Sequence, residues 1–396
     1  MIVFEILNFF LVLYLGASVL FLISYAILGK FHRKIKKPLN SKKNRFVVFI
    51  PAYKEDAVIY GVAKKALNQD YPSELFDIIV IADSFQQKTL DDLNLLPIIV
   101  KEVSFIKSTK AKALNKTMEE LPETLYDIAL ILDADNVLAL DFIAKINESF
   151  NAGFHVVQGH RTAKNTKGAF AMLDAMSEEI NNNIFSKGHR AIGLSSRLVG
   201  SGMAVSYQLF KEIMKNVDVV VAGEDKELEL TLLKRGYKIE YRDDAICYDE
   251  KVSQSEVFNN QRIRWISAQF HYFKKDFLTA FWHLIIKGNI DYFDKAFQMM
   301  LPPRLILHGF LFAAVIIAFF LSPELYFYVW LGIFLVNVLS YAISIPRRFY
   351  SIEMVHAFMS LPQAFFGVFI TLFKASGVNA NVGHTTHTYV DEEDTN

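Results

Sequence analysis

Acidic side chains stand at the ends of three apolar runs in the sequence. The runs read "RFVVFIPAYKED", "DIIVIADSF" and "DIALILDADN", and the acids in question are Glu55, Asp83, Asp133 and Asp135. Two carboxylates spaced as D-x-D supply hard oxygen ligands, and Mg²⁺ or Mn²⁺ binds such ligands while keeping positions for substrate phosphates. A lone D-x-D also occurs in ordinary loops, so its weight depends on the residues around it.

A basic segment upstream of the D-x-D fits the same chemistry. The stretch "STKAKALN" predicts the start of a helix with Ser108 or Thr109 as its cap, followed by Lys110 and Lys112. A helix N-terminus offers free backbone N–H groups and the lysines add positive charge, so the segment can hold a diphosphate. A lysine-rich exposed helix face is the alternative.

Another predicted helix, "GEDKELELTLLKRG", begins with two acids. Glu224 and Asp225 fall in its first turn, and Gly236 is predicted to end it. Acids in a first turn commonly offset the helix dipole by about 0.3 to 1 kcal/mol and do nothing else. The alternative is a general base that takes a proton from a hydroxyl nucleophile, a role worth roughly 10²- to 10⁴-fold in rate. The residues alone leave both interpretations open.

The elements that must position these side chains form an open α/β sheet. The three apolar runs predict buried parallel strands because both of their faces are apolar. Helical patterns at 58–68 and 110–120 lie between them, and strands alternating with helices indicate this fold class. Ligands of such sheets bind beyond the carboxyl ends of the strands, where the four acids fall. If the third strand continues through the D-x-D, both of its carboxylates point the same way.

Composition places part of the chain in a membrane. Of the 396 residues, 52% are hydrophobic, and the mean hydropathy is +0.23. Residues 6–29 form an uncharged apolar run, and a bilayer crossing needs about 20 such residues. A cleaved signal peptide is the rival interpretation, but its apolar core is shorter. The segment 30–45 is basic and contains no acid, so the following domain is expected in the cytoplasm.

Apolar runs return near the end of the sequence. The runs 304–323 and 325–346 are bracketed by arginines and predict a transmembrane hairpin. The run at 351–374 is interrupted by Pro362, so an interfacial or re-entrant helix competes with a fourth crossing, and we favour the interfacial helix. The main polar side chains within the crossings are Asn8, His308 and Asn337, which do not match the charged or broken helices of a transporter.

Eight segments follow from this pattern. They are a transmembrane helix at 1–29, a basic linker at 30–45, a cytoplasmic domain at 46–280, an interfacial segment at 281–303, transmembrane helices at 304–323 and 325–346, the helix at 351–374 and a tail at 375–396. Basic and acidic residues number 42 each, which gives no sign of a nucleic-acid partner. The single cysteine, Cys247, excludes an internal disulfide.

The stretch "NNQRIRW" precedes the predicted interfacial segment. If it is helical, Gln261, Arg264 and Trp265 share one face, because they are spaced i, i+3 and i+4. An amide, a guanidinium and an indole on one face can bind a hydroxyl, a phosphate and a sugar ring. An interfacial helix that uses Trp and Arg as membrane anchors is the alternative.

The motifs as an ordered set resemble those of a known family. "IPAYKED", "IADSF", "TKAKALN", "LDADN", "VGSGMAVS", "GEDKELELTLLKRGY" and "QRIRW" resemble membrane-bound, inverting family 2 glycosyltransferases, the group that includes cellulose, chitin and hyaluronan synthases. The resemblance covers residues 46–270. It implies a GT-A type fold, in which an open, mostly parallel sheet binds a nucleotide-sugar in the cytoplasm and transmembrane helices flank it.

The resemblance also implies roles for individual residues. The first nucleoside-binding loop corresponds to Pro51, Ala52, Tyr53 and Glu55, and Asp83 to the carboxylate that contacts the base. Lys112 matches the lysine near the diphosphate, Asp133 and Asp135 match the nucleotide and metal ligands, and Asp225 matches the catalytic base. The acceptor is expected at Gly200, Ser201, Gly202, Glu224 and Trp265, and the donor diphosphate near Gln261, Arg264 and Trp265. Thr386 and His387 fall in a segment that resembles the family's gating loop.

The implied activity is transfer of a sugar with inversion at the anomeric carbon. The expected partners are a nucleotide-sugar, by family habit a UDP-sugar, Mg²⁺ or Mn²⁺, and a glycan or lipid acceptor at the inner face of the cytoplasmic membrane. A polysaccharide synthase would need an accessory subunit or self-association, because three or four crossings are fewer than cellulose synthase-like enzymes use. A non-catalytic nucleotide-sugar sensor or scaffold is the alternative from another class.

Overall fold

The computed structural model of the chain describes residues 2–35, 42–217, 223–251, 254–321 and 323–374. The chain folds into two compact units, each assembled from separate stretches of sequence. The helical unit takes its described residues from 1–33, 166–194 and 252–374, and the sheet unit from 34–165 and 195–251. The predicted domain at 46–280 therefore gives two of its stretches, at 166–194 and 254–280, to the helical unit.

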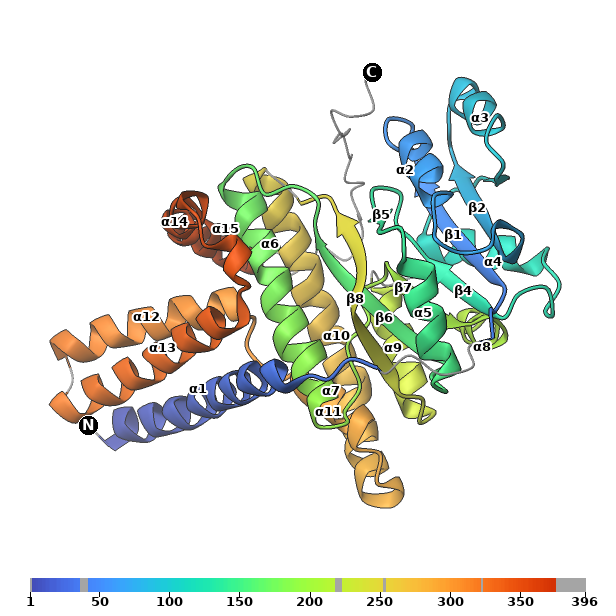
Figure 1. Ribbon diagram of the computed structural model, residues 1–396. Helices are drawn as coiled ribbons and strands as arrows, with labels where there is room; N and C mark the ends of the chain where they lie inside the picture. Colours follow the sequence, from blue (N-terminus) through green and yellow to red (C-terminus); the bar gives the residue numbers. More distant parts are fainter. Residues whose placement is uncertain (1, 36–41, 218–222, 252–253, 322, 375–396) are drawn as a thin grey trace. The chain divides into compact units, whose positions relative to one another are not determined.

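The sheet unit is built on an eight-stranded mixed sheet in the order β3-β2-β1-β4-β7-β6-β8-β5 (Figure 1). The strands are β1 (Phe46–Tyr53), β2 (Phe76–Asp83), β3 (Ile99–Val103), β4 (Ile128–Ile131), β5 (Val137–Leu138), β6 (Val156–Ala163), β7 (Met203–Ser206) and β8 (Ile239–Asp249). β1 to β4 pair in parallel, as does β6 with β8, whereas β7 and β5 pair antiparallel with their neighbours. The predicted open α/β sheet is confirmed.

Helices of the sheet unit follow the strands and cover the sheet. They are α2 (Ile59–Ala66), α3 (Gln87–Leu93), α4 (Lys110–Glu119), α5 (Phe142–Asn151), α8 (Tyr207–Met214) and α9 (Glu224–Lys234), with a 3-10 turn at Ser73–Leu75. Residues of β1 and β4 are buried on both faces, as the apolar runs predicted. Phe46, Val48 and Ile50 of β1 belong to the same buried cluster as Ile59 and Val62 of α2. This packing fixes the strand ends from which the acidic loops emerge.

The helical unit contains the long apolar helices. Its elements are α1 (Ile2–Leu28), η1 (Gly29–Phe31), α6 (Ala169–Asn181), the π-helix η3 (Asn182–Gly188), α7 (His189–Ala191), α10 (Ser255–Lys287), α11 (Ile290–Gln298), α12 (Arg304–Leu321), α13 (Glu324–Ser344), η4 (Arg347–Phe349), α14 (Ile352–Met359) and α15 (Leu361–Lys374). Four segments of the described chain are long and apolar enough to cross a membrane: Glu5–Phe31, Arg304–Leu321, Glu324–Ser344 and Ile352–Ile370.

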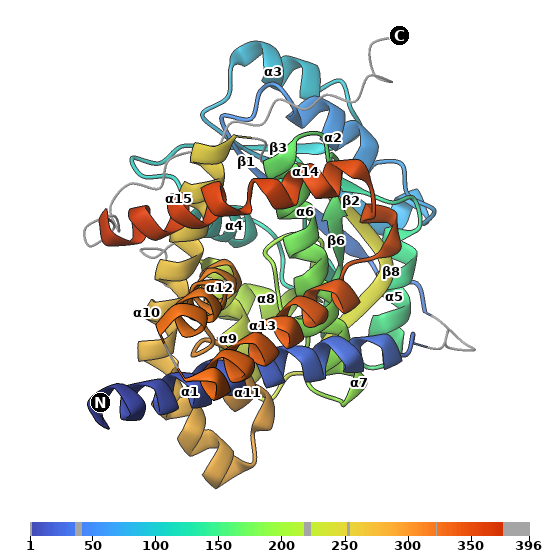
Figure 2. The ribbon, with the colours of Figure 1, turned by 90° about the vertical axis from the view of Figure 1, so that its left-hand side faces the viewer.

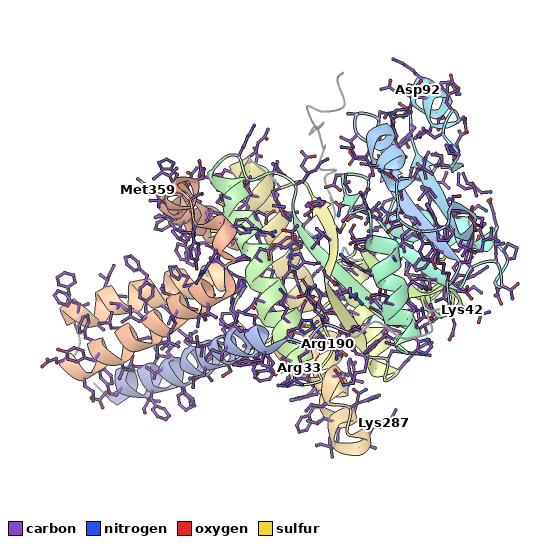
Figure 3. The ribbon with its side chains drawn as sticks, in the orientation of Figure 1. Arg33, Lys42, Asp92, Arg190, Lys287 and Met359 are labelled. Carbon is purple, nitrogen blue, oxygen red and sulfur yellow. The ribbon has the colours of Figure 1, made fainter. Side chains whose placement is uncertain are left out.

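The fourth of these segments differs from the others in its geometry. It consists of two helices, α14 and α15, which part at Ser360. Figure 1 looks along α14 and shows α12 lengthwise, whereas Figure 2 shows α14 and α15 lengthwise and looks along α12. The pair therefore runs across α12, with Met359 of α14 exposed (Figure 3). This arrangement suits the interfacial helix expected at 351–374, and the number of crossings stays a prediction.

Helix α6 is bound by arginines from three other elements of the helical unit. Arg262 of α10 forms an ion pair with Asp174. Arg304, at the start of α12, donates to the carbonyl and the hydroxyl of Ser177 at 3.0 and 2.9 Å. Arg348 of η4 donates to Glu179 at 2.6 Å. Asp174 and Glu179 are buried, and a buried carboxylate is stable only when it is paired. These pairs fix the ends of the apolar helices to α6.

Two glycines allow α1 to approach η3 closely. A Cβ on Gly188 would lie 2.4 Å from the Tyr25 carbonyl oxygen, and one on Gly29 would lie 2.5 Å from Asn183 Oδ1. Asn183 in turn donates from Nδ2 to the Ala26 carbonyl at 2.9 Å and to Ser344 Oγ at 3.1 Å. The end of α1, the π-helix and the end of α13 are therefore held together by contacts that tolerate no larger side chain.

We expect Gly188→Ala to lower the melting temperature of the detergent-solubilised protein. The added methyl group meets backbone, which cannot move aside as a side chain can, and overpacking of this kind costs about 1 to 3 kcal/mol. Gly332→Ala in α13 is the matched control, because nothing lies within 4 Å of its Cβ position. Equal melting temperatures for the two variants would contradict the close approach of α1 to η3.

Candidate active site

The ends of β1 and β2 bring the predicted nucleoside-binding residues together. Tyr53 and Asp83 are partners in the parallel register, and the Lys54 N–H donates to the Asp83 carbonyl at 3.1 Å. Lys54 and Ser84 follow the two strands with positive φ, 56° and 63°. Such backbone is strained for residues other than glycine and is concentrated at functional loops. Pro51 and Ala52 belong to β1 with Tyr53, so the expected nucleoside-binding loop begins only after the strand, where Glu55 lies.

Lys110, and not Lys112, reaches the D-x-D. Helix α4 begins as predicted, with the Thr109 hydroxyl accepting from the Lys112 N–H at 3.2 Å. The Lys110 ammonium donates to Asp133 and, at 2.6 Å, to the Gly200 carbonyl. The Lys112 ammonium instead donates to the Lys107 carbonyl at 2.9 Å. The structure thus places Lys110 beside Asp133 and turns the Lys112 ammonium toward the Lys107 carbonyl; the diphosphate role of Lys112 stays a prediction.

The acids around Lys110 stabilise its protonated form. Burial disfavours the ammonium form, but attraction from Asp133, Glu224 and Asp225 outweighs it and raises the pKa of Lys110. A cation surrounded by three carboxylates keeps its proton throughout the neutral range. The site therefore contains a permanent positive charge at the edge of the sheet.

The D-x-D lies in a turn and not in a strand. β4 ends at Ile131, and the Asn136 N–H donates to the Asp133 carbonyl at 3.0 Å. The alternation of strand side chains therefore does not extend to the two carboxylates. Asp133 is partly exposed and binds Lys110, whereas Asp135 is buried. The Asn136 amide lies 3.0 Å from both the Asp135 and the Asp249 carboxylates.

Two protein carboxylates are enough for a metal ion that also binds the phosphates of a substrate. In the described part of the chain no group of three or more His, Cys, Asp or Glu side chains could enclose a metal ion. Mg²⁺ and Mn²⁺ commonly bind to one or two protein carboxylates and complete their coordination with phosphate oxygens and water. The oxygen donors of Asp133 and Asp135 fit this pattern, with Asp133 as the exposed ligand.

The loop before β7 places Gly200 at the cavity beside Asp225, whereas Ser201 and Gly202 pack against other parts of the protein. Gly200 has a φ of 78°, and a Cβ there would lie 3.6 Å from that of Asp225. The Ser201 hydroxyl accepts from the Asp133 N–H at 2.9 Å, and a Cβ on Gly202 would lie 2.9 Å from that of Cys247. Of the three residues of this loop that were predicted to bind the acceptor, only Gly200 therefore lines the cavity beside Asp225.

Two buried side chains that the sequence-based analysis missed hold this loop. Gln158 of β6 donates to the Ser201 carbonyl at 2.9 Å and accepts from the Val199 N–H at 3.1 Å. Glu229 of α9 accepts from the Leu198 N–H at 2.8 Å. A lone glutamine in a strand and an acid within a helix carry no motif, so the sequence offered no signal for either.

Glu224 and Asp225 lie in the first turn of α9, as predicted. Both line a small cavity. The cavity has a volume of about 10 Å³ and is lined by Lys110, Leu114, Gly200, Met203, Phe210, Met214, Glu224, Asp225 and Leu228. Its wall is mostly apolar. Burial raises the pKa of Glu224; attraction to Lys110 opposes this shift, and repulsion from Asp225 adds to it. The Asp225 carboxylate accepts from the Lys226 N–H at 2.9 Å.

The "QRIRW" segment belongs to the helical unit, where it forms part of α10. Burial lowers the pKa of Arg264, and no carboxylate among the described residues offsets this effect. Gln261 Oε1 is likewise buried without a hydrogen-bond partner in the described chain. The guanidinium of Arg262 lies 4.6 Å from the ring of Trp265, which is 44% exposed. Arg262, three residues before Trp265, thus contacts the tryptophan. Thr386 and His387 lie outside the described residues.

Comparison with known families gives the enzyme class. Residues 44–268 match the family described as glycosyltransferase like family 2. The chain belongs to this family. The resemblance found in the sequence is thereby confirmed at family level, and the protein is a glycosyltransferase. The narrower likeness to cellulose and chitin synthases stays a prediction.

Individual relatives of this family 2 glycosyltransferase are distant. The chain is 25% identical over 254 residues to the beta-monoglucosyldiacylglycerol synthase of Nostoc sp., which covers 61% of this chain and 52% of that protein. It is 24% identical over 276 residues to the probable glycosyltransferase YdaM of Bacillus subtilis, covering 64% and 62%. The chain thus spans about half the length of the first relative.

A solved structure shares the fold. The mannosyltransferase PcManGT of Pyrobaculum calidifontis, in complex with GDP-Man and Mn²⁺, matches 91% of this chain and 99% of its own with a TM-score of 0.56 and 14% identity. At this identity the likeness shows the fold, which is the mixed α/β sheet of GT-A enzymes.

We expect Lys110→Met to reduce sugar transfer by about 10²- to 10³-fold, because it removes a fixed positive charge from the site where charge develops. Lys112→Met is the matched control, two residues further along the same helix turn, and should retain near wild-type activity. Release of nucleoside diphosphate from the donor measures both. A larger loss of activity in the Lys112 variant than in the Lys110 variant would instead support Lys112 as the lysine near the diphosphate.

We expect Glu224→Gln to stabilise the protein at high pH. Because the folded-state pKa of Glu224 is raised above its unfolded value of 4.5, the folded protein binds this proton more tightly, and stability falls as pH rises through the interval between the two values. The variant has no ionisable carboxyl group at this position, so it does not lose stability in this way as pH rises. Its melting temperature should exceed that of wild type at about pH 8 and converge with it at about pH 4. A constant difference across this range would contradict the raised pKa.

Proposed function

We propose that this glycosyltransferase moves a sugar from a nucleoside-diphosphate donor to a hydroxyl of a membrane-associated acceptor, with inversion at the anomeric carbon. The observation that supports it best is one cavity lined by Lys110, Glu224 and Asp225 at the carboxyl edge of the sheet, with Asp133 bound to the same lysine. A cation for a leaving diphosphate and a carboxylate for an attacking hydroxyl are the two charges that such a transfer needs.

Asp225 is proposed as the general base. It takes the proton of the acceptor hydroxyl as the oxygen attacks the anomeric carbon, and the bond from that carbon to the diphosphate breaks. Glu224, whose pKa is raised by burial, stands beside it and retains a proton to higher pH. It can therefore donate a hydrogen bond to an acceptor oxygen while Asp225 stays ionised. Gly200 leaves room for the acceptor because it has no side chain.

The donor is proposed to lie between the β1 and β2 loops and Lys110. Tyr53, Glu55 and Asp83 bind the nucleoside, and Lys110 binds the diphosphate. Asp133 and Asp135 would hold Mg²⁺ or Mn²⁺, which when bound neutralises charge on the leaving diphosphate. In the helical unit Arg264 carries a half-buried charge that no carboxylate among the described residues offsets, so it is a candidate for binding an anionic group. UDP is the family's common nucleotide and is the first choice here.

The acceptor is proposed to be a lipid at the inner face of the cytoplasmic membrane. Four apolar segments and the basic stretch at 30–45 support this location. The name of the Nostoc relative, a glucosyldiacylglycerol synthase, favours a lipid over a growing polysaccharide. A polysaccharide synthase would produce a ladder of products and need an accessory subunit or self-association, whereas a lipid acceptor yields one discrete glycolipid.

The decisive test combines a donor panel with one variant. Membranes carrying the protein are incubated with UDP- and GDP-sugars, with and without Mn²⁺, and nucleoside diphosphate release is measured for each. We expect metal-dependent release from one donor. Asp225→Asn should bind that donor as wild type does but lose transfer by at least about 10²-fold, because it lacks the base.

Full activity of Asp225→Asn would remove Asp225 as the base. Donor binding without release in the wild-type protein, for every sugar tested, would favour the nucleotide-sugar sensor or scaffold. Chromatography of the lipid extract then separates one glycolipid from a polymer.

A further inference from the structure

A single buried amide lies against two carboxylates beside the D-x-D. The Asn136 amide is 3.0 Å from the Asp135 carboxylate and 3.0 Å from the Asp249 carboxylate. Asn136 is fully buried and follows Asp135 directly in the turn after β4, whereas Asp249 ends β8. Ionised carboxylates accept hydrogen bonds and donate none. The end of the amide that faces them is therefore the NH₂ group, and one side chain donates to both acids.

The oxygen of the same amide is fixed as well. In this orientation Asn136 Oδ1 accepts from the Ser201 hydroxyl at 2.8 Å, and the Ser201 oxygen accepts from the Asp133 N–H at 2.9 Å. Ser201 is fully buried. A continuous chain of hydrogen bonds therefore runs from the backbone of Asp133 through Ser201 and Asn136 to the carboxylate of Asp135. It joins the two acids of the D-x-D by a second route, beside the covalent chain.

The charge of Asp249 is balanced by two cations of the sheet unit. The Lys251 ammonium lies 2.5 Å from its carboxylate, and the Arg161 Nε atom lies 3.7 Å from it. Lys251 is buried. A metal ion at Asp249 would meet repulsion from both of these positive charges. Asp249 is therefore the fixed acceptor of the pair, and it anchors the amide that binds Asp135.

Asp135 needs such a restraint because it lies between two strands. β4 ends at Ile131 and β5 begins at Val137, so the ladder of strand pairing does not extend to this acid. A carboxylate that binds a metal commonly accepts a hydrogen bond from a neighbouring residue, which fixes its orientation. Loss of that neighbour typically lowers metal affinity or activity about 10- to 100-fold. The amide of Asn136 provides the orientation that strand pairing does not.

We propose that Asn136 is a positioning residue that orients the Asp135 carboxylate for a divalent metal ion, while Asp249 and Ser201 fix the two ends of its amide. Asn136 acts through Asp135 and contributes no ligand of its own. This inference rests on the proposed function, in which Asp133 and Asp135 hold Mg²⁺ or Mn²⁺. It goes beyond that function, because the D-x-D motif by itself assigns no role to the residue that follows it.

The test measures Mn²⁺ binding directly, by electron paramagnetic resonance of the full chain in detergent with UDP or GDP present. We expect Asn136→Leu to weaken Mn²⁺ binding about 10- to 100-fold, because leucine is similar in size but donates no hydrogen bond. Asn147→Leu is the matched control. Asn147 is also a buried asparagine of the sheet unit, but it binds Asn44 and Lys42, so its loss should leave Mn²⁺ affinity as in wild type.

Ser201→Ala is the second variant, because it removes only the hydroxyl group between Asp133 and Asn136. We expect it to weaken Mn²⁺ binding less than Asn136→Leu does. Excess Mn²⁺ should restore sugar transfer in both variants, because the ligands themselves remain. A purely structural role of Asn136 would lower the melting temperature and leave Mn²⁺ affinity unchanged.

Wild-type Mn²⁺ affinity in both variants would overturn the inference, as would an equal loss in Asn147→Leu. If Asn136→Leu does not elute as a folded protein, Ser201→Ala decides alone. Asp135→Asn separates this inference from the proposed function. Unchanged Mn²⁺ affinity in that variant, or no Mn²⁺ binding by wild type, means that Asp135 holds no metal and overturns the inference. Mn²⁺ binding that depends on Asn136, in a chain that transfers no sugar from any donor, supports the role of Asn136 and refutes the proposed function.

Discussion

The candidate active site depends on the ammonium group of Lys110. Placing a cation below the surface costs several kcal/mol unless it is paired and hydrogen-bonded, and here one carboxylate and one backbone carbonyl bind it directly. Each partner comes from a different segment: Asp133 from the turn after β4 and Gly200 from the loop before β7. The single charge of Lys110 therefore holds together three segments of backbone: the start of α4, the turn after β4 and the loop before β7. On the proposed function, a donor diphosphate bound here exchanges one anionic partner of Lys110 for another.

A comparable constraint orders the helical unit. Helix α6 lies in the sequence between β6 and β7 of the sheet, yet its acids bind arginines of α10 and η4, and Ser177 binds Arg304 of α12. Apolar helices have no hydrophobic reason to associate with one another inside lipid, so polar contacts at their ends and small residues at their crossings determine how they pack. Gly29, directly after α1, and Gly188 in the π-helix are the small residues that allow the close crossing of α1 and η3. Helix α6 is thus the element to which the ends of the apolar helices are bound.

The sequence predicted the strands, the cap of α4 and the placement of Glu224 and Asp225, because each has a local signal: an apolar run, a threonine before lysines, acids in a first turn. It did not distinguish Lys110 from Lys112. Residues two apart on a helix point about 200° from each other, and of these two lysines Lys110 is the one that binds Asp133. The sequence also did not predict which way the Asp135 side chain points, because β4 ends two residues before the D-x-D. Gln158, Glu229 and Asn136 act through contacts between distant segments, and single-sequence patterns contain no trace of such contacts.

The structure also weighs the two interpretations of the acids at the start of α9. Relief of a helix dipole is worth at most about 1 kcal/mol and is obtained by acids that remain in water. Glu224 lies instead in a cavity with apolar walls, where burial raises its pKa and Asp225 adds repulsion. A helix that only needed its dipole offset would gain more from the same acids in solvent. Two carboxylates held together at a net cost, one of them with a raised pKa and both attracted to Lys110, are what an acid–base site requires. This energetic cost, more than the motif itself, supports the proposed acid–base role of Glu224 and Asp225 over that of an ordinary helix cap.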